Sequence, residues 1–200
     1  MTALEQIQKS GDFIELLPSE SVSIDLRYAS PNNFTGVNLY GDFNRAFLHR
    51  VAYEKFQRAI QNLRGAHPGY RFLVFDTVRT RTVQRILWNK VVGTPQQDYV
   101  ADPALGSLHN YGLAIDLTVL DAHGRELDMG TPFDDFTALA QPQNESQLRA
   151  DGKLSEAQLR NRLILRTAMT EAGFILLPVE WWHFNAIRRS EITSDYRVIE

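Results

Sequence analysis

The chain contains no cysteine among its 200 residues. This absence excludes disulfide bonds, thiolate metal ligands and a cysteine nucleophile. It does not identify the cellular compartment, because a secreted protein of this length can fold without disulfides. Any metal site or catalytic base therefore has to be sought among the histidine, aspartate and glutamate residues.

The sequence also lacks a strong excess of charge and a long apolar run. Its 21 lysines and arginines stand against 24 aspartates and glutamates, which gives no reason to expect a nucleic-acid partner. No apolar run approaches the ~20 residues that cross a membrane. The start, MTALEQIQKSGDF, is not typical of a signal peptide. We therefore expect a cytoplasmic protein without a membrane partner, although a mature periplasmic chain given a new Met1 would look the same.

The composition is otherwise that of an ordinary globular protein, with 44% apolar and 22% charged residues. A chain of this length buries roughly 70% of its unfolded surface, which is enough to fold on its own. No internal repeat interrupts it, so we expect one domain over residues 1–200. The oligomeric state has no signal in the sequence.

Apolar spacing predicts both helices and strands. Helical spacing is found in three segments, 46–63, 80–92 and 155–172. Gly65 and Gly173 are the expected stops of the first and last segment, and Ser155 starts a capping-box pattern. Strands are expected at 71–75, 113–120 and 174–179, with loops at 31–45, 93–107 and 130–152. This order favours an α+β fold, with helices packed on a small antiparallel or mixed sheet.

The clearest strand, Leu113–Leu120, reads LAIDLTVL, and its alternate residues belong to opposite faces. Asp116 shares the less apolar face with Ala114 and Thr118, two small residues that leave space beside its carboxylate. The sequence DAHG at 121–124 predicts a turn, so a hairpin is the expected continuation.

Two segments, SLHNYGLAID and EWWH, contain the side chains that can bind a metal or take part in catalysis. His109, Asp116 and His183 form a suitable ligand set for one catalytic Zn²⁺, with a fourth position left for water. Such a site keeps a net positive charge, which favours a more acidic water and a polarised carbonyl. Glu180 is not needed as a ligand, so it can take the proton of that water and pass it to a leaving amine.

The spacing within EWWH presents a geometric difficulty. On a regular strand, Glu180 and His183 point to opposite faces. Both can serve one metal only if the chain bends between them, so we predict a break there. Trp181 and Trp182 are expected to wall the site, and Gly112 is expected to let the chain turn before the strand.

Each residue also has a purely structural interpretation. Asp116 alone is most often a hydrogen-bonded buried carboxylate, and His109 alone a half-exposed loop residue. Paired tryptophans are more often part of a core. His49, His67 and His123 lack a comparable setting and are expected to be structural. Together the two segments favour a metal site, because the alternative is that several suitable side chains occur in them by independent structural coincidence.

The two segments match SxHxxGxAxD and ExWH, so the sequence resembles the zinc D-alanyl-D-alanine dipeptidases of the vancomycin-resistance type. Weaker matches are LRYA with NFTG, DMG with FD, and NR with GF. The resemblance covers about residues 24–186. It implies a fold related to that of D,D-carboxypeptidases and Hedgehog-like zinc proteins.

The resemblance also implies a role for each matching residue. The positions that match the family's zinc ligands and catalytic base are His109, Asp116, His183 and Glu180. Those that resemble its substrate contacts are Tyr28, Ser107 and Asp134. Arg79 matches the arginine assigned to transition-state stabilisation. Arg81 is a competing candidate, and an ion pair with Asp76 is the structural alternative for Arg79.

The sequence departs from the family at DTVRT, where DxYRP is usual, and this affects the pose of Arg79. Residues 138–155 match no family segment, and a lid is one interpretation. We expect hydrolysis of the dipeptide D-alanyl-D-alanine, as part of antibiotic resistance or of D-alanine recycling. The alternatives are a D,D-carboxypeptidase or endopeptidase acting on longer peptidoglycan peptides, and a catalytically silent zinc-binding module.

Overall fold

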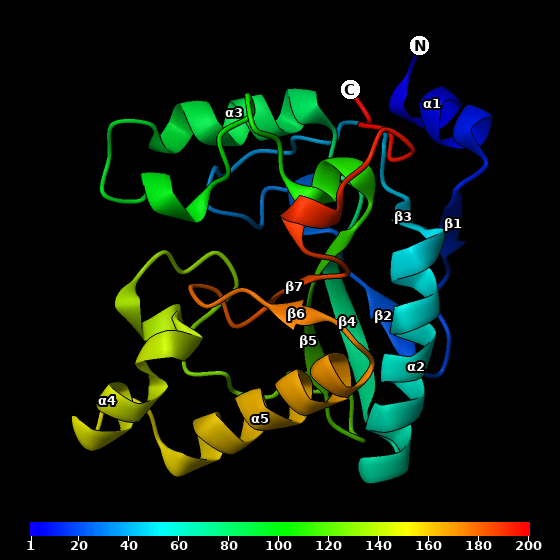
Figure 1. Ribbon diagram of the computed structural model, residues 1–200. Coiled ribbons are helices and arrows are strands. Elements are labelled where there is room, and N and C mark those ends of the chain that lie inside the picture. Colours follow the sequence, from blue (N-terminus) through cyan, green and yellow to red (C-terminus); the bar gives the residue numbers. More distant parts are fainter.

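The computed structural model of the protein describes all residues, 1–200. Its centre is a five-stranded mixed sheet with the strand order β2-β4-β5-β7-β6 (Figure 1). The strands are β2 (Val22–Ile24), β4 (Arg71–Asp76), β5 (Ala114–Leu120), β7 (His183–Asn185) and β6 (Ile175–Leu176). β2 runs parallel to β4, whereas the other neighbouring pairs are antiparallel.

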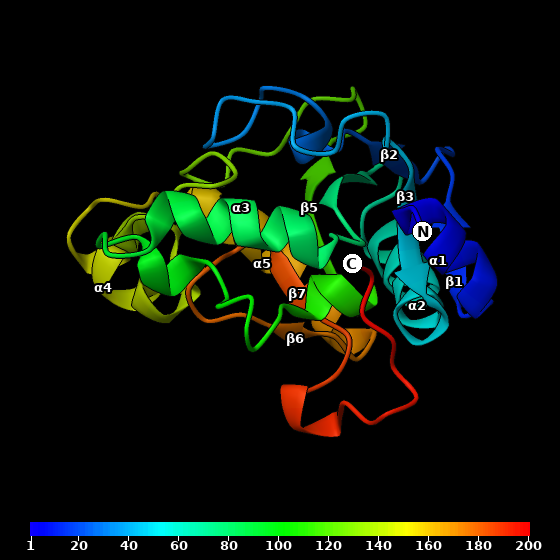
Figure 2. The ribbon, with the colours of Figure 1, turned by 90° about the horizontal axis from the view of Figure 1, so that it is seen from above.

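A small second sheet and five α-helices complete the α+β fold that the sequence predicts. The second sheet pairs β1 (Phe13–Leu16) with β3 (Ala46–His49). The helices are α1 (Ala3–Ser10), α2 (Arg50–Ala66), α3 (Arg81–Val91), α4 (Glu145–Ala150) and α5 (Glu156–Glu171). α2 and α5 share the main core with the sheet, and α3 lies at the opposite end of the molecule from α5 (Figure 1). The two chain ends lie close to each other in both ribbon views (Figure 2).

Alternation along β5 separates a packing face from a polar face. Val119 of β5 lies opposite Phe72 of β4, and Phe72 packs on Phe56 of α2 with ring centroids 5.3 Å apart. Directly opposed residues of antiparallel strands project to the same face, so helix α2 covers this one. Asp116 and Thr118 alternate with Val119 and project to the other face.

A bulge in β4 changes the face that Asp76 occupies. Val74 pairs with Leu117, and regular pairing would then put Phe75 opposite Asp116. The register instead shifts between Val74 and Asp76, so that Asp76 itself pairs with Asp116. The additional residue therefore moves Asp76 to the polar face of the sheet.

The segment expected as one helix over 46–63 is divided, which corrects the prediction. Its first four residues pair with β1 as β3, and α2 begins only at Arg50. His49 caps the helix, since its Nδ1 accepts the N–H of Val51. The helix also continues through Gly65, the expected stop, where a Cβ would meet nothing within 4 Å.

The hairpin expected after β5 is present only as a short antiparallel return, because the N–H of Leu127 donates to the carbonyl of Val119 but no second strand follows. The turn from Asp121 to Gly124 is present, but only a single bridge between Leu120 and Glu126 follows it. β6 keeps two residues of the strand expected at 174–179, because Pro178 has no N–H with which to continue the ladder. The expected loop at 130–152 contains α4, whereas the capping box at the start of α5 is confirmed.

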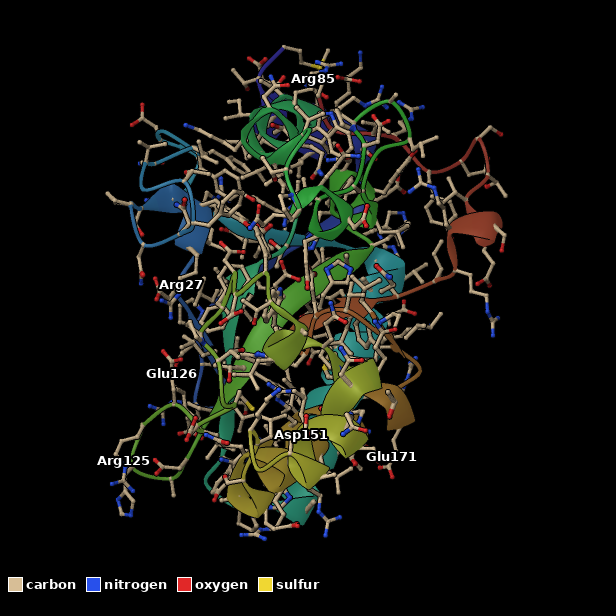
Figure 3. All side chains as sticks on the ribbon, turned by 90° about the vertical axis from the view of Figure 1, so that its left-hand side faces the viewer. Arg27, Arg85, Arg125, Glu126, Asp151 and Glu171 are labelled. Atoms are coloured by element: carbon tan, nitrogen blue, oxygen red, sulfur yellow. The ribbon has the colours of Figure 1, made fainter.

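Charged side chains cover the outside of the molecule. Figure 3 shows Arg85 at the outer side of α3 and Arg125 on the loop after β5, both pointing outward. Arg27, which follows β2, forms an ion pair with Glu126 of the segment after β5, with 3.1 Å between Nη2 and Oε1. None of the helices is both long and apolar enough to cross a bilayer.

Gly112 joins β5 to the preceding 3-10 turn, Leu108–Tyr111, at a tight crossing of the chain. Its φ of +65° lies in the left-handed region that glycine adopts readily. A Cβ here would lie 2.8 Å from the backbone nitrogen of His49 and 2.8 Å from Cε1 of Phe13. The turn expected at Gly112 is therefore confirmed, and a close approach of the chain accompanies it.

Gly112→Ala should lower the free energy of unfolding more than Gly36→Ala does. Gly36 has a φ of +71°, but a Cβ at this position would meet no atom within 4 Å, so it isolates the backbone effect. A left-handed backbone alone costs a non-glycine residue about 1–2 kcal/mol. Urea denaturation of both variants measures the difference, and equal losses would contradict the tight crossing.

Candidate active site

Three buried side chains, His109, Asp116 and His183, direct their ligand atoms at one place. Nε2 of His109 lies 3.2 Å from Nδ1 of His183 and 3.3 Å from the Asp116 carboxylate. Nδ1 of His183 lies 2.9 Å from the same carboxylate. The three ligand atoms lie within 4.8 Å of one another, so the residues predicted to bind metal are adjacent in the fold.

The outer ring nitrogen of each histidine has an oxygen partner of its own. Nδ1 of His109 lies 2.6 Å from the carbonyl oxygen of Thr77, and Nε2 of His183 lies 2.8 Å from Oδ1 of Asn185. Because these oxygens only accept, each outer nitrogen donates its N–H, and in the neutral imidazole each inner nitrogen then presents a lone pair. Three acceptors then face one another in a buried site, which requires a cation. Two imidazoles and a carboxylate fit a divalent metal, and such outer hydrogen bonds orient metal-binding histidines.

Strand register brings two of these ligands together. Asp116 and His183 are direct partners in the antiparallel β5–β7 pair, so their side chains project to the same face. His109 comes instead from the 3-10 turn before β5. Ser107 caps that turn, because its Oγ accepts the N–H of His109 at 3.3 Å.

The charges of the three side chains act on one another. Burial raises the pKa of Asp116, but the attraction and hydrogen bonds that the two imidazoles offer when protonated outweigh it and hold this pKa well below its usual range. Burial lowers the pKa of His183, whereas the Asp116 carboxylate raises it, and the net pKa lies above the usual 6.5. Protons therefore compete with a metal at His183.

Glu180 lies beside the three ligands because the chain breaks before β7. Trp181 and Trp182 form a turn, and the strand begins only at His183, which confirms the predicted break. Oε2 of Glu180 lies 3.8 Å from Nδ1 of His183. Burial raises the pKa of Glu180 to about 8, although the nearby His183 lowers it.

Arg79 contacts both the ion-pair partner suggested by the sequence and a candidate ligand. Its Nε donates to Asp76 at 2.8 Å, and its Nη1 donates to Gln84 at 3.1 Å. Its Nη2 lies 3.4 Å from Oδ2 of Asp116. The guanidinium also lies over the ring of Tyr28, 4.9 Å from the centroid. Arg79 therefore forms the ion pair with Asp76 and also lies in the site, so the two interpretations of this residue do not exclude each other.

Arg81, the competing candidate, points away from the site. Its Nη1 lies 3.4 Å from Oε1 of Glu200, and its backbone N–H donates to the carbonyl of Ile199. Val78, at the position of the missing aromatic residue, packs with Ile7 and Ile199 in a small core of its own. The departure at DTVRT therefore leaves the segment before Arg79 anchored to both ends of the chain.

Four residues that hold the site in place were not predicted: Tyr40, Gln84, Asn110 and Asn185. The Tyr40 hydroxyl donates to the buried Asp76. Asn110 Nδ2 donates to the carbonyl of Arg79 at 2.8 Å, and Gln84 binds Arg79 directly. Only Asn185 had a signal in the sequence, since it lies two residues after His183 on a strand and therefore on the same face.

Asp134 is held in an unusual backbone conformation beside Tyr28. It is the one non-glycine residue with a positive φ, +62°. Its Oδ1 accepts the hydroxyl of Tyr28 at 2.9 Å, and its Oδ2 accepts the N–H of Phe34 at 3.4 Å. Burial raises the pKa of Asp134 to about 7, although the Tyr28 hydrogen bond lowers it.

These residues line one cavity of about 410 Å³. The eight predicted site residues in its wall are Tyr28, Arg79, Ser107, His109, Asp116, Asp134, Glu180 and His183. Trp182 also lines it, whereas Trp181 packs in the core and donates to Thr131 at 2.8 Å, which corrects its expected place. No residue of 138–155 lines the cavity, so the lid interpretation is not supported.

The sequence over residues 12–198 matches the profile of the peptidase M15 family, described as D-ala-D-ala dipeptidase. It is 35% identical over 163 residues to a D-alanyl-D-alanine dipeptidase of Escherichia coli K12, covering 82% of this chain and 78% of the relative. Similar enzymes of Enterococcus faecium and Synechocystis are 30% and 27% identical. They cover 80% and 66% of this chain, and 83% and 66% of their own lengths.

Zinc affinity of the metal-free protein should fall as the pH is lowered from 8 to 6. His109 and His183 bind metal only when neutral, and Asp116 raises the pKa of His183 above 6.5. Below that pKa the apparent affinity should drop by roughly tenfold per pH unit for each displaced proton. Titration calorimetry measures affinity and proton release, with His67→Ala as the control. An affinity that does not change with pH, or that survives His183→Ala, would contradict the site.

Proposed function

The chain belongs to the peptidase M15 family of D-ala-D-ala dipeptidases, and on this basis we propose that it hydrolyses D-alanyl-D-alanine to two molecules of D-alanine. The observation that carries the proposal is the convergence of His109, Asp116 and His183 in one cavity with Glu180 beside them. A metal-binding module without catalytic function would have no need for the buried carboxylate of Glu180.

We assign the metal to His109, Asp116 and His183, with zinc as the ion. A divalent metal bound there supplies Lewis acidity, which lowers the pKa of water and polarises a carbonyl. Thr77 and Asn185 keep the two imidazoles oriented with their lone pairs toward the ion. The protein's remaining task is to move a proton and to stabilise the charge that develops on the substrate.

Glu180 is the general base of this proposal. Its carboxylate stands 3.8 Å from His183 Nδ1, next to the three ligand atoms. It accepts a proton from the attacking water and returns it to the nitrogen of the amide that breaks. A group serves best in both steps when its pKa lies near the working pH, and burial moves the pKa of Glu180 upward from its usual acidic range toward neutrality.

Arg79 is the group that stabilises negative charge on the scissile carbonyl oxygen. Charge develops there as water adds to the carbonyl carbon. The guanidinium is fixed in advance by Asp76 and Gln84, so little reorganisation accompanies the reaction. One pre-placed donor of this kind is worth about 3 kcal/mol of transition-state stabilisation.

Asp134 is the partner of the substrate's free ammonium group. It lines the same cavity, and Tyr28 and the Phe34 N–H fix its carboxylate. A carboxylate and an ammonium form a charge-assisted hydrogen bond that positions the dipeptide. Ser107, which lines the cavity as well, is proposed as a further substrate contact.

The activity is tested by incubating the purified protein with zinc and either D-alanyl-D-alanine or a pentapeptide that ends in it. We expect free D-alanine from the dipeptide and none from the pentapeptide. Cleavage of the pentapeptide alone would identify a carboxypeptidase. Zinc binding without turnover of either peptide would overturn the proposed function.

Glu180→Gln should lower kcat by at least about 100-fold, since it removes the proton acceptor but retains the shape of the side chain. Zinc content should be unchanged, because Glu180 is not one of the three ligands. D-alanine release and bound zinc are the two measurements, and Glu171→Gln on the surface of α5 is the matched control (Figure 3). Retention of full activity by Glu180→Gln would exclude it as the base.

Asp134→Asn should raise KM for the dipeptide and change its pH dependence. Burial raises the pKa of Asp134 to about 7, so its carboxylate is charged above this pH and neutral below it. The ratio of wild-type to variant kcat/KM should therefore increase as the pH rises through about 7. Titrations of other groups, present in both proteins, cancel in this ratio. A ratio that stays constant across this range of pH would contradict the role of Asp134.

A further inference from the structure

The dipeptide of the proposed function carries a carboxylate as well as an ammonium group, and the carboxylate needs a partner. Three arginines line the cavity: Arg79, Arg188 and Arg189. No lysine lines it. A cation that binds this carboxylate must have hydrogen-bond donors that neither the protein nor the scissile carbonyl already uses, and this condition separates the three.

Arg79 and Arg189 already have protein partners. Every guanidinium nitrogen of Arg79 has one, on Asp76, Gln84 or Asp116. Both terminal nitrogens of Arg189 donate to backbone carbonyls before the turn that carries His109, with 2.7 Å between Nη1 and the carbonyl of Gly106. Arg189 is therefore engaged with the backbone, and the N–H groups that remain on Arg79 are already assigned to the scissile carbonyl oxygen, so neither is available for the carboxylate.

Arg188 is different, because its guanidinium forms neither a salt bridge nor a hydrogen bond with the protein. Its side chain is exposed at the rim of the cavity. Its backbone, by contrast, is fixed: its N–H donates to Oε2 of Glu191 at 2.7 Å, and the preceding residue, Ile187, is buried. A firmly held main chain therefore presents a free cation at the mouth of the site.

Sheet order puts Arg188 across the site from Asp134. The Tyr28 that anchors Asp134 follows β2, at one side of the sheet. Arg188 follows β7, on the other side of β5 and of Asp116. A dipeptide with its ammonium group at Asp134 and its scissile bond at the metal ligands therefore extends toward Arg188.

We propose that Arg188 binds the free carboxylate of the substrate and so restricts hydrolysis to peptides with a single residue after the scissile bond. Ile175, Leu177 and Ile187 supply an apolar wall on this side of the cavity, suited to the side chain of that residue. The inference rests on the proposed function and makes its substrate class more specific.

The test compares D-alanyl-D-alanine with D-alanyl-D-alaninamide, which keeps the ammonium group and lacks the carboxylate. Arg188→Met should raise KM for the dipeptide roughly tenfold, the effect of losing a charged hydrogen bond at a partly exposed site. It should leave kcat for the dipeptide and kcat/KM for the amide unchanged. Arg188→Lys should restore part of the loss, and added salt should weaken the wild-type preference for the carboxylate.

Arg160→Met is the matched control, because Arg160 is an exposed arginine of α5 that does not line the cavity. It should match wild type on both substrates. Equal losses on the two substrates in Arg188→Met, or no loss on either, would overturn this inference alone. Wild-type protein that releases D-alanine from neither substrate would overturn the proposed function and this inference with it.

Discussion

Repulsion among three buried acceptors is the constraint on which the rest of the site depends. Two imidazole nitrogens and a carboxylate face one another at hydrogen-bond distance, and a cation is what allows them to remain there. The surrounding structure keeps them from turning away. Thr77 and Asn185 hold the outer nitrogens, and the β5–β7 register holds Asp116 and His183 on the same face. The fold therefore holds these acceptors in a mutually repulsive arrangement, and metal binding can offset that unfavourable energy.

The remaining groups are connected to this centre through the backbone as well as through side chains. The N–H of Arg79 donates to the carbonyl of His109, and Asn110 returns a hydrogen bond to the carbonyl of Arg79. The N–H of Ile199 donates to the carbonyl of Asn110, and its own carbonyl accepts from Arg81. The segment that carries a ligand and the segment that carries the charge-stabilising arginine thus form one unit, which the last residues of the chain brace.

The sequence was most informative where a local pattern and a chemical requirement coincide. Asp116 could be placed on the polar face of its strand from alternation alone, and the break before His183 followed from the need for Glu180 to reach the same place. The error at Ala46–His49 has a simple origin, since the apolar spacing there fits a helix as well as a strand, and the pairing with β1 decided it. Contacts such as Tyr40 with Asp76 join residues far apart in the chain, and no local pattern reports them.

The bulge in β4 has a consequence for how this protein can vary. Asp76 reaches Arg79 only because the bulge leaves one residue of the strand unpaired, which puts Asp76 opposite Asp116 on the polar face. The number of residues between Phe72 and Asp76 is thus restricted more tightly than their identity. Exchanges among apolar side chains there leave the spacing intact, whereas a single-residue insertion would move Asp76 opposite Ile115 and so rotate it into the helix-covered layer. Among diverging relatives, insertions should accordingly be rarer within this strand than substitutions, even though it contacts no substrate.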